Sequence, residues 1–263
     1  MIRLPALLLA LAACGGAQAQ QRPYEPLIAT YDRAPEDDPE LKALIETLHR
    51  AVADRNFELI DASLSKDVAA LECETDPTRA CQPGLKALTR SDAKLPPPLR
   101  LRQALCCRDI LPARISRALR DQTLLGVVGS ALEEESVGAH PALPGLACLP
   151  AWPRFDAAKA AAIAAAADIE RENLRVATRE LVLRGTPSAG AAEVARIAPG
   201  QMAPLVTDLP DSIPDGWTAI ALPQGGIGYT DMLGLTDLAP AGLCFARDAA
   251  GKWSIALAVQ RRS

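Results

Sequence analysis

Short apolar runs separated by turn residues fill much of the C-terminal half of this chain. Between residues 181 and 235 the apolar positions alternate or cluster, and each run ends at glycine or proline. This pattern is typical of small antiparallel sheets. Two further alternating runs flank residues 248–252 and predict a β-hairpin over residues 243–259, with Gly251 free to take a positive φ at its turn.

The N-terminal half has the spacing of helices instead. Asp38 is placed to cap a helix whose first position is Pro39, and apolar residues then recur every three or four positions. A second apolar set lies at 57–64, and a third helical stretch runs from 99 to 135 with a break at Pro112. The pattern predicts a mostly helical domain over residues 35–150, with the three prolines at 96–98 as a linker or helix lead-in.

An alanine-rich segment follows a loop rich in turn-forming residues. Asp156 is placed to cap this segment, and alanine has the highest intrinsic helix propensity. We therefore predict a connecting helix over residues 156–173 between the helical part and the sheet.

The runs after residue 174 resemble a bacterial SH3-type (SH3b) domain. The segments that carry the resemblance are Leu183-Arg184 with Pro187-Ser188, Ile197 to Gly200, and Gly216-Trp217 leading to Gly228-Tyr229. The resemblance implies a compact β-barrel over residues 174–236 and, as in several relatives, recognition of cell-wall peptides. The expected fold class is thus α+β: an N-terminal helical domain, a small SH3-like barrel and a C-terminal hairpin.

The first residues have the features of an export signal. Arg3 precedes an apolar stretch of about ten residues, and Ala17-Gln18-Ala19 fits a cleavage site, so residues 1–19 are predicted to be a signal peptide. Residues 11–15 also resemble a lipobox, in which Cys14 would be lipidated and become the new N-terminus. Both interpretations place the mature chain in the periplasm, and the second anchors it to a membrane through Cys14.

The cysteine content agrees with export. Seven cysteines are encoded, and removal or lipidation of Cys14 leaves an even number. These are Cys73, Cys81, Cys106, Cys107, Cys148 and Cys244. An oxidising compartment would pair them, although their connectivity stays open at this stage.

Three local considerations bear on that pairing. Cys73 and Cys81 could close a short loop, whereas the adjacent Cys106 and Cys107 are expected to bond to different partners because a vicinal bridge is strained. Cys148 and Cys244 flank the predicted sheet. A bridge between these two would clamp the sheet to the preceding domain and stabilise the fold by roughly 4 to 5 kcal/mol in the loop-entropy model.

Charge and composition exclude some classes of function. The 263 residues carry a formal net charge of -4, and only nine of them are aromatic. A surface built for nucleic acid would be basic, and base-stacking platforms need aromatic side chains. A local positive patch lies on the stretch from Arg100 to Arg120. It indicates either contact with an anionic envelope component or a solvated helix face paired with Glu133-Glu134-Glu135 or with the acidic residues around Asp38.

Catalytic chemistry has little support. Only His49 and His140 are present, and a Cys148–His140 nucleophilic pair would need a free thiol, whereas an exported cysteine is usually bridged. The cysteines lack the spacing of a zinc site, and the Gly225-Gly226 run fits a β-turn rather than a phosphate loop. We expect no catalytic residue, metal or cofactor.

The functional hypothesis follows from these features. We expect a non-catalytic cell-envelope protein whose SH3-like module binds peptidoglycan or an envelope protein, with Trp217 and Tyr229 as groove residues unless they simply fill the core. The alternatives are a cysteine-dependent enzyme acting on the cell wall or on thiols, and a purely structural accessory protein. No nucleic-acid partner is expected, and membrane contact is expected only through Cys14.

Overall fold

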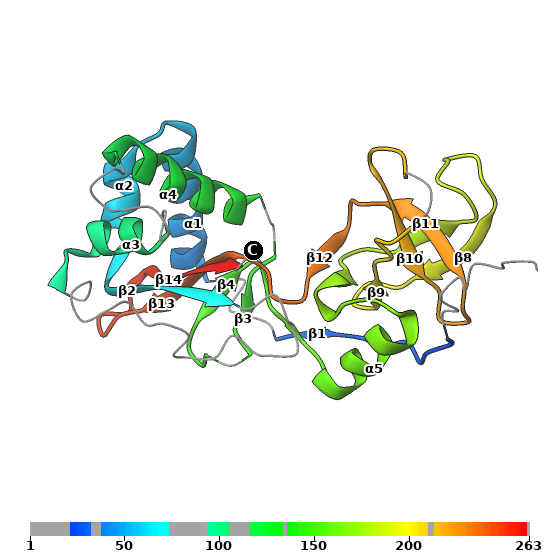
Figure 1. Cartoon of the computed structure of the whole chain (residues 1–263). Coiled ribbons are helices and arrows are strands. Elements are labelled where there is room, and N and C mark those ends of the chain that lie inside the picture. The colour runs from blue at the N-terminus through cyan, green and yellow to red at the C-terminus, as the bar shows by residue number, and fades with distance from the viewer. Residues whose placement is uncertain are drawn as a thin grey trace, which may run out of the picture.

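The computed structural model describes residues 22–32, 38–73, 94–105, 116–133, 136–141, 143–209 and 213–261. These residues form two lobes (Figure 1). We call the described residues between 38 and 151, with those from 242 to 261, the α lobe, and the described residues of 22–31 and 155–238 the β lobe. Helices and strands occur together in both lobes, which confirms the α+β class.

The α lobe is built on a five-stranded sheet. In spatial order its strands are β2 (Leu64–Cys73), β14 (Trp253–Arg261), β13 (Gly242–Arg247), β4 (Ala147–Leu149) and β3 (Gly138–Ala139). Strand β2 runs parallel to β14, and the other pairs are antiparallel. The predicted C-terminal hairpin is therefore β13 and β14, at the centre of this sheet. Residues 35–150 were predicted to be mostly helical, but they also supply three strands of this sheet, β2, β3 and β4. The helical spacing did not indicate these strands.

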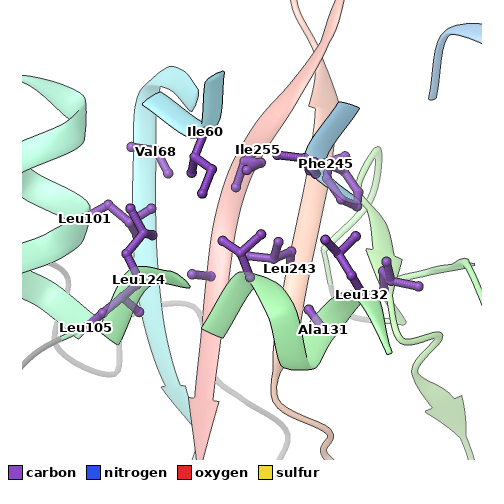
Figure 2. Close-up of a cluster of buried hydrophobic side chains, with 14 of the residues drawn as sticks. Ile60, Val68, Leu101, Leu105, Leu124, Ala131, Leu132, Leu243, Phe245 and Ile255 are labelled. Atoms are coloured by element: carbon purple, nitrogen blue, oxygen red, sulfur yellow. The ribbon is translucent and has the colours of Figure 1, made fainter. Parts of the chain in front are cut away.

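The helices of the α lobe are α1 (Pro39–Ala53), α2 (Phe57–Ala62), α3 (Pro97–Leu105) and α4 (Arg117–Leu132). Asp38 caps α1 as predicted, accepting hydrogen bonds from the backbone N–H groups of Glu40 and Leu41. Buried side chains of helices and sheet meet in one core, which includes Leu101 and Leu124 from the helices and Ile255 and the fully buried Phe245 from the sheet (Figure 2). Pro112 lies outside the described residues.

A polar contact joins the start of α1 to the hairpin. Asp38 Oδ2 also accepts a hydrogen bond from Arg247 on β13, and this guanidinium lies 5.1 Å from the centre of the Trp253 ring on β14. Burial raises the pKa of Asp38, but interactions of its carboxylate with the Trp253 side chain, the Leu41 N–H and Arg247 outweigh burial and hold the pKa below its ordinary value. One carboxylate thus caps a helix and fixes that helix to the sheet.

The β lobe contains two small sheets and one helix. One sheet has the order β10 (Trp217–Ala221), β11 (Ile227–Asp231), β7 (Leu181–Arg184), β8 (Glu193–Ile197). The other has the order β12 (Leu235–Asp237), β6 (Leu174–Ala177), β9 (Met202–Pro204). An isolated bridge between Leu205 and Ile220 connects them. Strands therefore occupy the runs where apolar alternation predicted them.

Helix α5 (Ala157–Ala167) begins at the predicted cap, Asp156, but ends earlier than expected. Asp168 takes the left-handed conformation there, with φ 55°, and a 3₁₀ turn follows at Arg171–Asn173. Within α5, Ala160, Ile163 and Ala164 pack against Leu174 and Met202 of the three-stranded sheet. The helix is thus part of the β lobe's core rather than a spacer.

The β lobe is an insertion in the sheet of the α lobe. The chain leaves that sheet after β4 and returns to it at β13, so the inserted residues lie between two adjacent strands. The chain start also belongs to the β lobe, since Tyr24 donates its N–H to Pro223 O and Ala29 donates to Gly200 O. Strand β1 (Thr30–Tyr31) then pairs with β5 (Pro153–Arg154) where the chain passes between the lobes.

A Cys148–Cys244 disulfide, one of the pairings that the sequence left open, lies at the base of this insertion. The two residues are paired neighbours on β4 and β13, so the bridge lies within the α lobe's own sheet. It therefore joins the entry and exit of the inserted lobe, and the expectation that it clamps the later sheet onto an earlier domain was wrong. Cys14, Cys81, Cys106, Cys107 and the side chain of Cys73 lie outside the described residues.

Candidate functional site

The two aromatic residues predicted to line a groove lie on neighbouring strands of the four-stranded sheet. Trp217 pairs with Asp231, and Tyr229 pairs with Ala219. Since side chains alternate along a strand, Trp217, Ala219, Tyr229 and Asp231 all point to the same face. Trp217 and Tyr229 are therefore diagonal neighbours, with Cα atoms roughly 7 to 8 Å apart, and both are half-buried.

The opposite face of this sheet contains the lobe's core. Leu181, Leu183, Ile197 and Ile220 are almost fully buried there. Gly228 lies on this inner side, and a Cβ added to it would be 2.9 Å from the Leu183 Cβ atom. The inner face is thus filled without Trp217 or Tyr229. Trp217 and Tyr229 lie on the opposite, outer face, where both are half-buried and Ala219 beside them is fully buried.

A positive charge adjoins the aromatic pair. Arg184 on β7 is the register partner of Tyr229 and shares the outer face with it. Its guanidinium is half-buried and donates to the carbonyl of Ala191 at 2.7 Å. A hydrogen bond from Arg196 lowers the pKa of Glu193, and the charge of Arg184 acts in the same direction. Trp217, Tyr229 and Arg184 thus share the outer face of the four-stranded sheet.

The glycine-rich run beside this face is a hairpin turn, as expected. Gly225 and Gly226 have φ values of 91° and 84°, and the Leu222 N–H donates to Gly226 O at 2.9 Å. These positive φ values suit glycine and close β10 onto β11. The run therefore connects two strands rather than a strand and a helix.

The residues considered for cysteine catalysis do not form a nucleophilic pair. The sulfur of Cys148 is bonded to Cys244 and holds no thiolate in this state. His140 is buried, and its ring lies 4.5 Å from the Trp152 ring, centre to centre. Burial lowers the pKa of His140 to about 4, so it is neutral at neutral pH. His49 is exposed on α1. No cluster of metal-ligating side chains occurs among the described residues.

The arginines of the predicted positive patch have separate roles. Arg102 is buried and bonds through Nε to Asp121 and through Nη1 to Asp61, each at 2.6 Å. Arg100 donates to backbone carbonyls of Lys66 and Leu95. These partners differ from both sets of acidic residues expected from the sequence, because the tertiary fold brings α2 and α4 to Arg102. Arg108 and Arg114 lie outside the described residues.

Two surface features were not found from the sequence. Met232 and Leu233, in the turn after β11, are 57% and 73% exposed. On the α lobe, α4 and the ends of β13 and β14 line a hollow of about 490 Å³. For Met232 and Leu233, the sequence offered one signal, an apolar pair followed by glycine at position 234. The hollow joins residues far apart in the chain and had no sequence signal.

Comparison of the chain with protein-family models, with curated proteins and with solved structures gives no significant match. Within the described part of the chain, the helices are too short or too polar to cross a membrane.

Proposed function

We propose that this chain is an exported, non-catalytic protein of the cell envelope whose β lobe is an SH3-like barrel that binds the peptide part of peptidoglycan. The observation that carries the proposal is that Trp217 and Tyr229 are diagonal neighbours on the face of the sheet opposite the lobe's core, where both are partly exposed. Aromatic side chains with polar tips favour a wet binding surface.

The barrel is supported by how the two sheets meet. The Leu205–Ile220 bridge links the end of β9 to β10, so a path of paired strands passes from one sheet to the other. Residues of both sheets also share one core, in which Ala177 and Ala203 of the three-stranded sheet join Leu183 and Ile220. A small closed sheet has these two properties, since its strands surround a single interior.

The chemistry of the outer face suits a short peptide with free carboxylates. Trp217 and Tyr229 offer flat apolar surfaces, and Arg184 adds a cation next to Tyr229. Stem peptides of the cell wall combine small apolar side chains with carboxylates, which these groups can contact together.

The Cys148–Cys244 bond supports the proposed location. Disulfides persist in oxidising compartments such as the bacterial periplasm and are rare in a reducing cytosol. Because Cys148 is bonded to Cys244, it has no free thiol for a cysteine-dependent reaction. The proposal therefore includes no catalytic step. Signal cleavage after Ala19 and lipidation at Cys14 are both compatible with it.

Co-sedimentation of the purified chain with isolated peptidoglycan sacculi tests the proposal. We expect the wild type to sediment with the sacculi, and Trp217→Ala or Tyr229→Ala to weaken binding at least about tenfold, or roughly 1.4 kcal/mol. Leu99→Ala is the matched control, because Leu99 is 50% exposed but lies on α3 of the other lobe. A wild-type chain that stays in the supernatant contradicts the proposal, as does equal binding by all variants.

A further inference from the structure

The guanidinium of Arg184 is held in place from one side. Arg184 lies on β7 beside Tyr229, and its Nη1 donates to the carbonyl of Ala191 at 2.7 Å. Ala191 belongs to the loop between β7 and β8, which is closed by a hydrogen bond of 2.9 Å from the Gly185 N–H to the carbonyl of Ala192. A cation that is positioned before its ligand arrives loses little conformational entropy on binding.

This hydrogen bond leaves one edge of the Arg184 guanidinium for a ligand. Nε and Nη2 form an edge that matches the two oxygens of a carboxylate, and Nη1 lies outside that edge. Arg196 on the adjacent strand β8 shows this arrangement within the chain itself. Its Nε and Nη2 donate to the two carboxylate oxygens of Glu193, at 2.7 and 2.9 Å. Arg184 can hold the carboxylate of a ligand in the same way.

Two acidic side chains on the outer face are already paired with other arginines. Glu193 is the register partner of Arg184, but its ion pair is with Arg196. Asp231 follows Tyr229 on the same face of β11 and is paired with Arg179 at 2.8 Å. Arg184 makes no ion pair with the residues that the structure describes, so its charge is available to a ligand.

The two aromatic residues extend the site away from Arg184. Register partners have Cβ atoms about 4.5 to 5.5 Å apart and diagonal neighbours about 7 to 8 Å, so the row from Arg184 over Tyr229 to Trp217 is about 12 Å long. An extended chain advances about 3.3 Å per residue, so this row matches a peptide of about three or four residues. The charged end of the row is at Arg184.

We infer that Arg184 binds the terminal carboxylate of a short peptide whose preceding residues lie over Tyr229 and Trp217. The inference rests on the proposed function and makes its ligand more specific. A cross-link in the wall converts the carboxylate of one stem peptide into an amide, which is uncharged and has a single oxygen. The protein therefore selects stem peptides that are not cross-linked, and Arg184 is the residue that determines this specificity.

Two forms of one peptide test the selection. The probe is a peptide of three D-alanine residues, acetylated at its amino end, with either a free carboxylate or an amide at its other end. We expect the wild type to bind the acid at least about tenfold more tightly than the amide in a calorimetric titration. Equal affinity for the two forms, or binding of neither, overturns the inference, and this comparison depends on no variant.

Sedimentation with sacculi is measured on the same preparation of protein. A wild type that sediments with sacculi but does not discriminate between acid and amide retains the proposed function and loses the inference. A wild type that neither sediments nor binds the peptide loses both.

Variants assign the discrimination to Arg184. Arg184→Gln should bind acid and amide equally, and Arg184→Lys should fall between this variant and the wild type, because lysine retains the charge but not the planar fork. Lys159→Gln is the matched control, since it removes one positive charge from an exposed position on α5 of the same lobe. It should discriminate as the wild type does. Discrimination that persists in Arg184→Gln, or that is lost equally in Lys159→Gln, overturns the inference.

Discussion

Cys148 and Cys244 are 96 residues apart in the chain, yet their Cα atoms lie 3.9 Å apart on adjacent antiparallel strands. The whole inserted part of the β lobe lies between them. The bond therefore closes a loop that contains a folded unit. Breaking the bond affects the two strands, β4 and β13, between which that unit is inserted.

Replacing both cysteines by alanine should lower the free energy of unfolding by about 4 to 5 kcal/mol, the loop-entropy value for a closed loop of this length. The measurement is urea unfolding of the oxidised wild type and of the double variant. The double variant is also measured under reducing conditions as the control, because any change in its midpoint then reports bridges other than Cys148–Cys244. Equal midpoints for oxidised and reduced protein would contradict the prediction.

The two ion pairs that Arg102 forms with Asp61 and Asp121 should stabilise the fold jointly. Arg102→Met leaves the carboxylates of Asp61 and Asp121 without their shared cation, and we expect a loss of about 3 to 5 kcal/mol in the free energy of unfolding. Adding Asp61→Asn and Asp121→Asn should recover part of the loss. Arg117→Ala should change stability by less than about 0.5 kcal/mol, because Arg117 is exposed and lies 3.6 Å from Asp121. Equal losses for Arg102→Met and Arg117→Ala would refute this account.

His140 should make stability depend on pH. Its pKa falls from 6.5 in the unfolded chain to about 4 in the folded chain because of burial. The unfolded state thus binds the proton more tightly, and the contribution of His140 is complete above the higher value and lost as pH falls toward the lower one. Between about pH 7.5 and 4.5 the loss should be roughly 2 to 3 kcal/mol.

Carboxylates titrate over part of the same range, so the prediction concerns a difference between proteins. His140→Phe should be less sensitive to acid than the wild type by that amount, whereas His49→Phe, at an exposed position on α1, should follow the wild type. Urea unfolding at the two pH values measures both. Parallel pH profiles for wild type and His140→Phe would rule the effect out.

Gly228→Ala should destabilise the β lobe. The added Cβ would lie 2.9 Å from Leu183 Cβ and 3.1 Å from Leu222 Cδ2, and overpacking of this kind costs about 1 to 3 kcal/mol. Gly190→Ala is the control, since a Cβ there meets nothing within 4 Å. Thermal unfolding should show a lower midpoint for Gly228→Ala alone. Equal midpoints for the two variants would show that β11 does not pack closely on β7.

The sequence by itself determined the features that depend on neighbouring residues. Asp38 and Asp156 cap helices where the sequence places them, because a cap needs only the next two or three N–H groups. Alternating apolar residues and paired glycines likewise indicated the hairpins β10–β11 and β13–β14, whose strands are joined by short turns. The outer-face placement of Trp217 and Tyr229 follows from register once that hairpin forms.

Only the tertiary structure decided which distant segments pair. Strand β2 lies beside β14, so Leu64 and Ile255 are register partners, and Cys148 faces Cys244. The Arg102 ion pairs and the hollow on α4 have the same origin, since their parts come from several elements. Local propensity contains no information on such pairings, because their free energy comes from burial and hydrogen bonding between segments that meet only when the whole sheet assembles.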